Sequence, residues 1–314
     1  MSLNFAITGV AGYVAPKHLA AIQACGHRLV AALDPHDSVG ILDRYFPEAR
    51  FFKEFERFDR HLEKLRRQGE AHRVHYLTIC APNYLHDAHV RAALRVGAHA
   101  ICEKPLVLNP WNLEALAELE RETGQRVYSV LQLRHHPAIR RLRDRVQTEK
   151  SSKKHDIQLT YITARGNWYL NSWKGSEPHS GGLASNIGIH FFDMLLWLFG
   201  AVETMTVYRR EAARAAGSLV LEQARIQWFL SIDPADLPEA IRQDDGRTYR
   251  SIRIDGAELD FTHGFENLHT ELYRDILAGG GFGIEDNRQV IQLIHDIREC
   301  PLQPQAGEQK RALQ

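Results

Sequence analysis

The feature that most constrains the fold is a glycine-containing turn between an apolar strand and a helix near the start of the chain. Residues 3–8 are predicted to form a strand and residues 14–25 a helix, and the turn between them reads Gly9-Val10-Ala11-Gly12-Tyr13-Val14. Glycines at such a corner let backbone N–H groups approach a pyrophosphate, and the helix N-terminus favours its negative charge. The match to G-x-G-x-x-G is imperfect, since Ala11 and Val14 stand at the second and third glycine positions. An ordinary strand–turn–helix corner therefore explains this turn equally well when it is taken alone.

An acidic residue at the end of the next apolar strand strengthens the nucleotide interpretation. Asp34 follows the run 29–33 and stands 25 residues after Gly9, near the spacing of a carboxylate that binds ribose hydroxyls. The next residues, Pro35-His36-Asp37, include no Arg or Lys for a 2′-phosphate, so NAD is favoured over NADP. Two alternatives stay open here. Asp34 could cap a following helix, and a methyltransferase also carries an acidic residue at this position.

The order of the predicted elements divides the chain into two parts. With 314 residues and about 150 residues per domain, two domains are expected. In the first part, apolar strands such as 74–80 and 98–102 alternate with helical segments, which is typical of a parallel sheet with crossover helices. After Pro137 strand-like runs follow with few helices between them, which favours antiparallel pairing. The sequence predicts an α/β domain over 1–134 and an α+β domain with a large, mostly antiparallel sheet over 135–314. The strands expected in the second domain are 157–163, 205–210, 224–232 and 249–254, and its helices are 138–150, 268–277 and 285–298.

Charge and cysteine usage exclude several classes of protein. Lys plus Arg and Asp plus Glu both number 39, so the chain lacks the basic excess of a nucleic-acid-binding protein. The four cysteines have no paired spacing and are expected to be buried thiols in a reducing compartment.

The N-terminus has no secretory pattern, and the most apolar run, 189–202, is too short to span a bilayer. We expect a soluble cytoplasmic protein with no nucleic-acid and no membrane partner. No metal site is expected, because His86/His89 and His135/His136 have no third ligand at a zinc-like spacing.

Two polar segments follow neighbouring strands of the first part. Residues 81–86 (Ala-Pro-Asn-Tyr-Leu-His) follow one strand, and Glu103-Lys104-Pro105 follows the next. In open α/β sheets ligands bind outside the carboxyl ends of the strands, so both segments should face the same crevice as the Gly9 turn. A lysine directly after a buried strand and before a proline is a positioned ammonium. Such a group either lowers the pKa of a substrate hydroxyl or polarises a carbonyl.

A second candidate for proton chemistry lies in the later part of the chain. The segment 181–193 precedes an apolar helix and contains Asn186, His190 and Asp193. Their spacing of four and three residues predicts that they share one helix face. His190 could then take a proton from a hydroxyl while a hydride leaves the same carbon. The alternative is a buried histidine that is hydrogen-bonded to Asp193.

The ordered set of GVAGYV, Asp34, APNYLH, EKP and GGLASNIGIHFFD resembles the glucose–fructose oxidoreductase/inositol dehydrogenase (Gfo/Idh/MocA) family. The resemblance covers nearly the whole chain up to about residue 300. It implies an N-terminal Rossmann domain that binds NAD and a C-terminal domain whose large open sheet often forms an oligomer interface, so a homo-oligomer (dimer or tetramer) is expected. It implies Lys104 and His190 as the catalytic pair. The family usually carries an Asp four residues before that histidine, and Asn186 here removes a carboxylate that would share the proton. The NAD contacts that the resemblance implies are Gly9, Gly12, Tyr13, Val14, Asp34, Ser38, Pro82, Asn83, His86, Glu103, Lys104, Gln132 and Trp168.

Several segments, among them GVAGYVAPKH, LQLRHH and TYITARGNWYLNSWKG, are similar to bacterial dehydrogenases of a nucleotide sugar within this family. That likeness implies NAD-dependent oxidation of the C3 hydroxyl of UDP-2-acetamido-2-deoxy-glucuronate, on the route to diacetamido-mannuronate of surface polysaccharide. A UDP-uronate is an anion, so its pocket needs cationic donors and packing faces. Three alternatives stay open: the loop 165–174 as part of a subunit interface, a free sugar or polyol such as inositol as the substrate, and a protein that senses NAD without turnover. The expected substrate contacts are Lys104, Arg165, Tyr169, Trp173, Lys174, Asn186 and His190.

Overall fold

The computed structural model of the protein describes residues 2–149, 153–260 and 264–304. It divides into two compact units. The first comprises Met1–His135 and Phe265–Arg288, and the second comprises His136–Gly264 and Gln289–Gln314. The units divide next to the expected boundary at residue 134, and residues 265–288, expected in the second domain, lie in the first unit. This segment returns to the first unit and carries a helix there.

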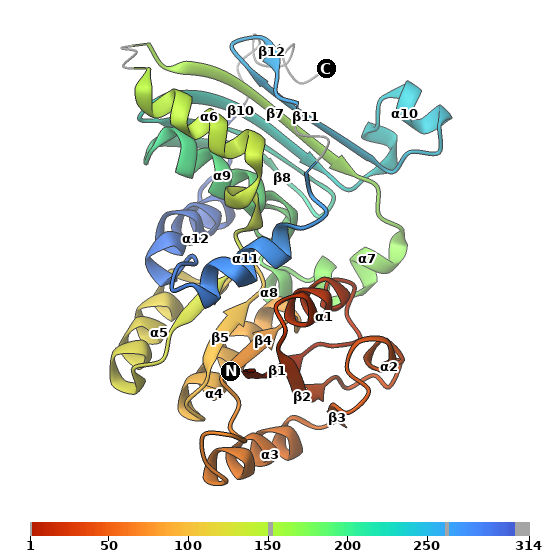
Figure 1. The fold of residues 1–314 in the computed structure, drawn as a ribbon. Helices are drawn as coiled ribbons and strands as arrows, with labels where there is room; N and C mark the ends of the chain where they lie inside the picture. The colour runs from red at the N-terminus through yellow and green to blue at the C-terminus, as the bar shows by residue number, and fades with distance from the viewer. Residues whose placement is uncertain (1, 150–152, 261–263, 305–314) are drawn as a thin grey trace. The chain divides into compact units, whose positions relative to one another are not determined.

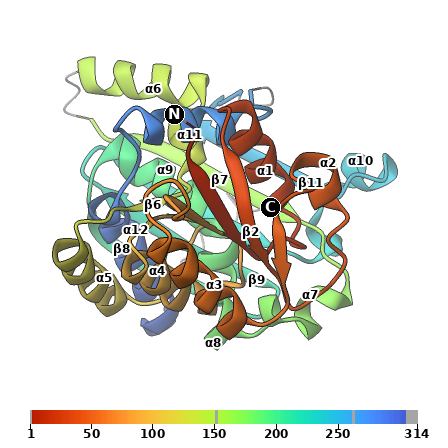
Figure 2. The same ribbon diagram turned by 60° about the horizontal axis from the view of Figure 1, so that its bottom comes forward.

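The first unit is built on a six-stranded parallel sheet with the order β3-β2-β1-β4-β5-β6. This order confirms the predicted Rossmann topology, and it reverses between β1 and β4, where ligands bind in such sheets. Figure 2 shows β1 and β2 side by side. The strands are β1 (Asn4–Thr8), β2 (Arg28–Leu33), β3 (Arg50–Phe52), β4 (Tyr76–Ile79), β5 (His99–Cys102) and β6 (Val127–Ser129). The helices of this unit are α1 (Ala15–Ala24), α2 (Ile41–Tyr45), α3 (Phe55–Arg67), α4 (His86–Arg95), α5 (Pro110–Thr123) and α11 (Leu268–Leu277), with 3-10 turns at Asn83–Leu85 and Gln132–His135.

Burial explains why α11 belongs to the first unit. Every residue of β1 is buried, as expected of a central strand that helices cover on both faces. Leu272, Tyr273 and Ile276 of α11 lie in the same apolar core as Phe5 and Leu19. Helix α11 lies beside α1 (Figure 1). The sequence pattern of 268–277 predicts a helix but does not indicate which part of the protein that helix packs against. A boundary drawn at one point in the sequence therefore misses the return of α11 to the first unit.

The second unit is built on a six-stranded mixed sheet with the order β12-β11-β7-β10-β9-β8. Only the β7–β10 pair among these neighbours is parallel, which confirms the predicted, mostly antiparallel sheet. The strands are β7 (His155–Thr163), β8 (Val202–Arg210), β9 (Arg214–Leu221), β10 (Ala224–Ser231), β11 (Thr248–Ile254) and β12 (Ala257–Glu258). The helices are α6 (Pro137–Thr148), α7 (Asn167–Asn171), α8 (Glu177–Ser180), α9 (Ile189–Phe199), α10 (Glu239–Gln243) and α12 (Ile284–Glu299). Helix α12 starts in the first unit. There are also 3-10 turns at Trp173–Gly175 and Pro234–Asp236 and a π-helical turn at Ala184–Gly188.

The two faces of this second sheet differ. Helix α9 covers one face, where Phe192 packs edge-on against the buried Trp228 of β10 with ring centroids 5.3 Å apart. Along β7, Ile157 and Leu159 are buried, whereas Asp156 and Gln158 are exposed. This alternation is typical of a sheet with one face in the core and one face open.

The apolar helical stretch of this unit is longer than the sequence predicted. Together, α8, the π-helical turn and α9 lie in one stretch from Glu177 to Phe199, 23 residues long, whose most apolar window has a mean hydropathy of 1.3. By length and composition this stretch could cross a bilayer, so the expectation that the most apolar run is too short to do so, which was based on 189–202, is wrong. However, 78% of that window is buried inside the protein. Core helices of soluble proteins share these properties, so the stretch is weak evidence for a membrane span.

Substitution of Gly9 tests how strongly the first turn depends on glycine. Gly9 has φ +76°, and an added Cβ would overlap the backbone of Cys80 and Ala81. Gly26 has nearly the same φ, +75°, but no heavy atom within 4 Å of such a Cβ. We expect Gly26→Ala to lower the free energy of unfolding by about 1 kcal/mol, from the positive φ alone. Gly9→Ala should cost about 1–3 kcal/mol more, because the overlap adds to that strain. Urea unfolding of both variants measures the difference, and equal losses would contradict the close approach.

Candidate active site

Asp34 holds the glycine turn in place. Its side chain is 5% exposed. One carboxylate oxygen accepts the backbone N–H of Ala11 at 2.9 Å, and the other accepts that of His36 at 2.9 Å. The helix that follows, α2, begins only at Ile41 and has Gly40 at its N-cap, so the alternative of Asp34 as a helix cap is wrong. An ionised carboxylate accepts several hydrogen bonds, and the same group therefore retains acceptor capacity for ribose hydroxyls.

The residues of this turn fit the pyrophosphate of a dinucleotide. The Gly9 N–H donates to the carbonyl of Leu33 at 2.8 Å, which fixes the turn against the end of β2. An added Cβ at Gly12 would lie 3.0 Å from the Gly9 carbonyl oxygen, so side chains larger than hydrogen are disfavoured here as well. Helix α1 begins directly afterwards at Ala15. Tyr13 is 96% exposed. The loop before α2 contains Ser38, which is also exposed.

Two further polar segments lie at the carboxyl ends of β4 and β5. Asn83 and Glu103 are buried, whereas Pro82 and Lys104 are partly exposed. After β6, the side-chain oxygen of Gln132 is buried and has no hydrogen-bond partner within the described part of the chain. An orphaned buried acceptor is costly, and a bound ligand with an N–H group would satisfy it. This observation supports the predicted role of Gln132 in cofactor binding.

His86, which the sequence predicts as an NAD contact, lies behind these loops. It is 1% exposed. Its Nδ1 lies 2.7 Å from the carbonyl oxygen of Pro105, and its Nε2 lies 2.8 Å from that of Ala81. Burial lowers the pKa of His86, although both carbonyls and Glu103 act in the opposite direction. The side chain thus joins the two loops, and we infer that it positions the cofactor site through them.

A cluster that sequence reasoning missed surrounds Glu103. His18 of α1, Glu103 after β5 and His269 of α11 are all buried, and their ligand-type atoms lie within 4.8 Å of one another. The residues are 85 and 166 positions apart along the chain, so spacing carried no signal of this proximity. The geometry is compatible with a metal ion as well as with hydrogen bonds. The expectation of no metal site considered His86 and His89 instead.

In the second unit, the structure brings together the predicted substrate contacts of 165–174. The Lys174 ammonium lies 4.4 Å from the ring centroid of Trp173 and 5.5 Å from that of Trp168. Burial, and then the positive charge of Arg165, lower the pKa of Lys174. Within the described residues neither Arg165 nor Lys174 forms an ion pair with a carboxylate. Two cations without a counter-ion form a setting that favours an anionic ligand. Trp168, predicted as an NAD contact, is 54% exposed in this group.

Tyr169 connects this group to the segment of the predicted catalytic histidine. It is 2% exposed, and its hydroxyl oxygen accepts a short hydrogen bond from the side-chain amide of Asn186. Burial raises the pKa of Tyr169, while the bond from Asn186 and the charge of Arg165 act in the opposite direction. The Asn186 amide therefore occupies a buried polar position next to a phenol.

The helix face that the sequence predicted for Asn186 and His190 is interrupted. Asn186 lies in the π-helical turn, and His190 lies in the first turn of α9. A π-helical turn holds about one residue more than an α-helical turn and frequently occurs at functional sites. The two residues therefore do not have the regular α-helical spacing that the prediction assumed. His190 is partly exposed and Asp193 is buried, and the alternative of a hydrogen bond between them stays open.

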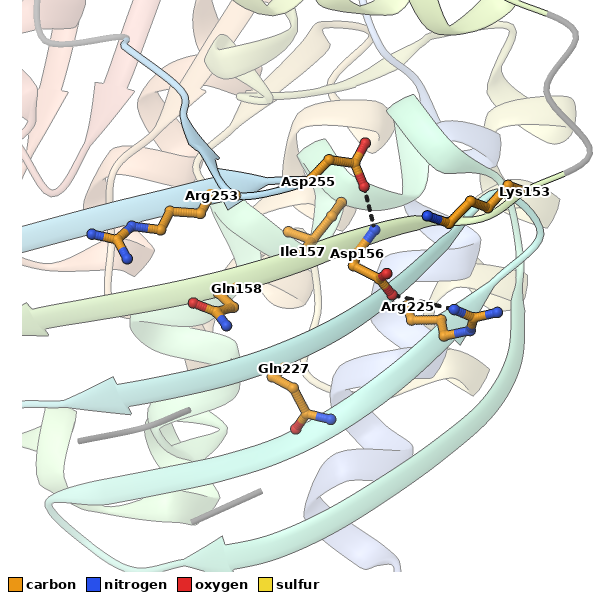
Figure 3. A pocket seen from close by; sticks show the side chains of 9 residues that line it. Lys153, Asp156, Ile157, Gln158, Arg225, Gln227, Arg253 and Asp255 are labelled. Atoms are coloured by element: carbon orange, nitrogen blue, oxygen red, sulfur yellow. Dashed lines mark hydrogen bonds and ion pairs between the residues drawn. The ribbon is translucent and has the colours of Figure 1, made fainter. Parts of the chain in front are cut away.

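A hollow of about 560 Å³ lies elsewhere, on the open face of the second sheet (Figure 3). Its charges are of both signs and partly paired: Arg225 contacts Asp156 at 3.3 Å, and an oxygen of Asp255 accepts the Asp156 backbone N–H at 2.9 Å. None of the predicted site residues lines it. The polar side chains that line it are Lys153, Asp156, Gln158, Arg225, Gln227, Arg253 and Asp255.

The chain is similar to proteins of one oxidoreductase family. Residues 3–131 match the NAD-binding Rossmann fold of an oxidoreductase family, Gfo/Idh/MocA, and residues 153–233 match its C-terminal alpha/beta domain. The WlbA (WbpB) dehydrogenase from Thermus thermophilus, solved in complex with NAD and UDP-GlcNAcA, is 51% identical, with 98% of each chain covered and a TM-score of 0.93. The chain belongs to the Gfo/Idh/MocA family. Its first unit is an NAD-binding Rossmann domain, which confirms the predicted cofactor over the methyltransferase alternative.

More distant relatives show how varied the substrates of this family are. The D-glucoside 3-dehydrogenase of Escherichia coli is 26% identical over 127 residues, which are 40% of this chain and 35% of the relative. The scyllo-inositol 2-dehydrogenase (NADP(+)) IolW of Bacillus subtilis is 24% identical over 193 residues, which are 59% of this chain and 54% of the relative. The chain thus spans about half or less of the curated relatives it matches. The WlbA dehydrogenase from Bordetella pertussis, at 19% identity and a TM-score of 0.74, shares the fold.

Asp34 gives a direct test of the nucleotide site. We expect Asp34→Ala to weaken NAD binding about 10- to 100-fold, because it removes the acceptor that holds the Ala11 N–H and the one proposed for the ribose. Asp37→Ala is the matched control, since Asp37 is exposed and pairs only at the surface, with Lys53 at 3.1 Å. Titration calorimetry with NAD measures both affinities. Equal affinities for the two variants would remove Asp34 from the cofactor site.

Proposed function

We propose that the protein is an NAD-dependent dehydrogenase that oxidises the C3 hydroxyl of UDP-2-acetamido-2-deoxy-D-glucuronate to the 3-keto sugar. The observation that carries this proposal is the relative from Thermus thermophilus, which is 51% identical over 98% of both chains and was solved with NAD and UDP-GlcNAcA. The same relative was also solved with NAD and alpha-ketoglutarate. We therefore include in the proposal that a 2-oxo acid is reduced to a 2-hydroxy acid as NADH returns to NAD.

The chemistry of the second unit supports an anionic substrate over a neutral polyol. A UDP-uronate carries several negative charges, and Arg165 and Lys174 supply positive charge that no carboxylate neutralises within the described residues. The indole faces of Trp168 and Trp173 offer flat apolar surfaces beside the Lys174 ammonium. Asn186 is uncharged where the family usually has an Asp, so it adds no repulsion toward an anion.

We assign the proton chemistry to Lys104 and His190. When NAD is bound, it accepts the hydride that leaves C3 with its electron pair. His190 removes the hydroxyl proton as the C=O bond forms, and the Lys104 ammonium stabilises the negative charge that develops on the oxygen. The alcohol would thus lose a proton to His190 and a hydride to NAD, which together make up its oxidation to the ketone, while Lys104 keeps its own proton. A protein that only senses NAD has no use for such a pair.

Location and assembly complete the proposal. We propose a cytoplasmic homo-oligomer, a dimer or tetramer, that works in bacterial surface polysaccharide (lipopolysaccharide O-antigen) biosynthesis and supplies a keto sugar to an aminotransferase. Exposed side chains alternate with buried ones along β7, so the second sheet has one open, partly charged face. We propose this face as the surface where copies associate.

The decisive experiment follows NADH absorbance with the purified protein. We expect NADH to form with NAD and UDP-GlcNAcA but not with inositol or glucose, and to be consumed when alpha-ketoglutarate is added. Lys104→Ala and His190→Ala should each lower turnover at least about 100-fold, because each removes a group that acts in the transition state. NAD binding, measured by titration calorimetry, should persist in both variants.

Each result separates one alternative. Turnover of inositol but not of the UDP-sugar would favour the polyol dehydrogenase. NAD binding without reduction by any hydroxylated substrate would favour the sensor. Near-normal turnover of both alanine variants would show that the proton chemistry was assigned to the wrong residues.

The lowered pKa of Lys174 gives a pH-dependent prediction. A lysine whose pKa is depressed keeps its positive charge below that pKa and loses it as the pH rises, earlier than an ordinary lysine does. The KM for UDP-GlcNAcA should therefore rise on the alkaline side in the wild type. In Lys174→Arg this rise should vanish, since a guanidinium stays charged, and in Lys174→Met the KM should be high at every pH. An identical pH profile in all three proteins would exclude Lys174 from anion binding.

A further inference from the structure

Glu103, directly before Lys104, and four other buried polar side chains of the first unit form one cluster. They come from elements that are distant in sequence, and none is more than 7% exposed. Polar groups buried to this extent are costly unless they are hydrogen-bonded, so their arrangement requires a physical explanation. They are His18 of α1, Thr78 of β4, Glu103 after β5, and His269 and Tyr273 of α11.

The distances define a chain of hydrogen bonds that ends at the carboxylate. Thr78 Oγ1 lies 2.8 Å from the Tyr273 hydroxyl, and that hydroxyl lies 2.9 Å from Nδ1 of His18. Nε2 of His18 lies 2.9 Å from Oε1 of Glu103. His269 Nε2 lies 3.5 Å from the same oxygen. The other oxygen of Glu103, Oε2, accepts the backbone N–H of Lys104 at 3.2 Å.

The donors and acceptors of this chain point in one direction. Burial alone raises the pKa of Glu103, but the hydrogen bond to His18 and the nearby His269 ring, whose Nε2 lies 3.5 Å from Oε1 without making a hydrogen bond, outweigh it and hold that pKa well below the ordinary value. Burial lowers the pKa of His18, which favours a neutral ring with a single proton. That proton must stand on Nε2 to face an ionised carboxylate. Nδ1 is then an acceptor for the Tyr273 O–H, and the tyrosine oxygen accepts the Thr78 O–H.

We propose that His18, His269 and Tyr273 are positioning residues that hold Glu103 as an oriented anion and, through it, the loop of Lys104. This inference rests on the role proposed for Lys104 above. The link is direct, because Glu103 precedes Lys104 in the chain and one of its carboxylate oxygens binds the backbone N–H of that lysine. It also gives residues 265–288 a function besides packing, since α11 supplies two of the three positioning side chains.

The same atoms are compatible with a different occupant, which makes the inference testable. A metal ion bound by His18 Nε2, His269 Nε2 and Glu103 Oε1 would require both nitrogens to be unprotonated. The hydrogen-bonded array of Thr78, Tyr273, His18 and Glu103, with His269 beside it, instead requires a proton on His18 Nε2. The 2.9 Å separation of that nitrogen from Oε1 is an ordinary hydrogen-bond length, which favours the array.

A first experiment needs no substrate and examines the array itself. In histidine-labelled protein, ¹⁵N NMR should show His18 as the neutral Nε2–H tautomer at neutral pH. The His18→Gln variant assigns the signal. The titratable neighbours, in addition to the array's own members, include Lys17, His86, Lys104, Cys25, Cys80 and Cys102. An imidazolium at neutral pH, the Nδ1–H tautomer, or one equivalent of tightly bound metal by elemental analysis would overturn the inference.

A second experiment measures the effect on catalysis. Tyr273→Phe and His269→Leu should each lower kcat about tenfold with the KM for NAD unchanged within about twofold. His269→Gln should recover most of kcat, because its side-chain amide keeps a polar N–H group beside Glu103. Ser129→Ala is the matched control: it deletes a buried hydroxyl of the same sheet that has no hydrogen-bond partner in the described residues, and kcat should not change.

These readouts separate the two proposals. Wild-type kcat in both Tyr273→Phe and His269→Leu, or an equal loss in Ser129→Ala, would overturn the positioning role. If the wild type does not oxidise UDP-GlcNAcA, the proposed function fails, and the NMR experiment alone decides the array. Failure of His269→Gln to recover kcat in a folded protein would also overturn it, since the argument rests on a polar N–H group of residue 269 beside Glu103.

Discussion

The close approach of the Gly9 turn to the backbone at the end of β4 is the constraint on which the first unit depends. Because no side chain fits between Gly9 and Cys80, the ends of β1 and β4 meet where the strand order reverses. The Gly9 N–H bonds to Leu33 at 2.8 Å, which adds the end of β2 to the same point. Asp34 and the loops after β4 and β5 are then brought to one edge of the sheet by backbone geometry alone, before any side chain binds a ligand.

A buried carboxylate at that edge explains why the chain returns to the first unit after residue 264. Removing an ionised carboxyl from water costs several kcal/mol unless hydrogen bonds offset it, and Glu103 is 7% exposed. The groups that offset the cost of burying Glu103 come from α1, which supplies His18, and from α11, which supplies His269. His269 and Tyr273 are four residues apart and share a helix face, while Leu272 and Ile276 anchor that helix in the apolar core. Packing and electrostatics thus require the same helix.

The sequence predicted what local patterns determine and missed what depends on contacts between distant segments. The parallel and mostly antiparallel sheets followed from periodicity, and NAD as the cofactor from the Gly9 turn with Asp34 together with the family resemblance. Strand β9 was missed, since its Ala215-Ala216-Gly217 core is small and weakly strand-like. The π-helical turn at Asn186 was missed because its residues also fit an α-helix. His18, Glu103 and His269 were not connected, since no spacing rule links positions so far apart.

The replacement of a family aspartate by Asn186 changes both hydrogen bonding and charge in the second unit. A carboxylate at this position would accept the hydroxyl hydrogen of Tyr169, whereas the Asn186 amide donates to the tyrosine oxygen and leaves that hydrogen to point elsewhere. A carboxylate would also offset part of the positive charge of Arg165 and Lys174, which burial already makes costly at Lys174. With an amide there, no carboxylate at this position offsets that charge, so the same substitution that removes a proton partner also leaves this part of the second unit more positive.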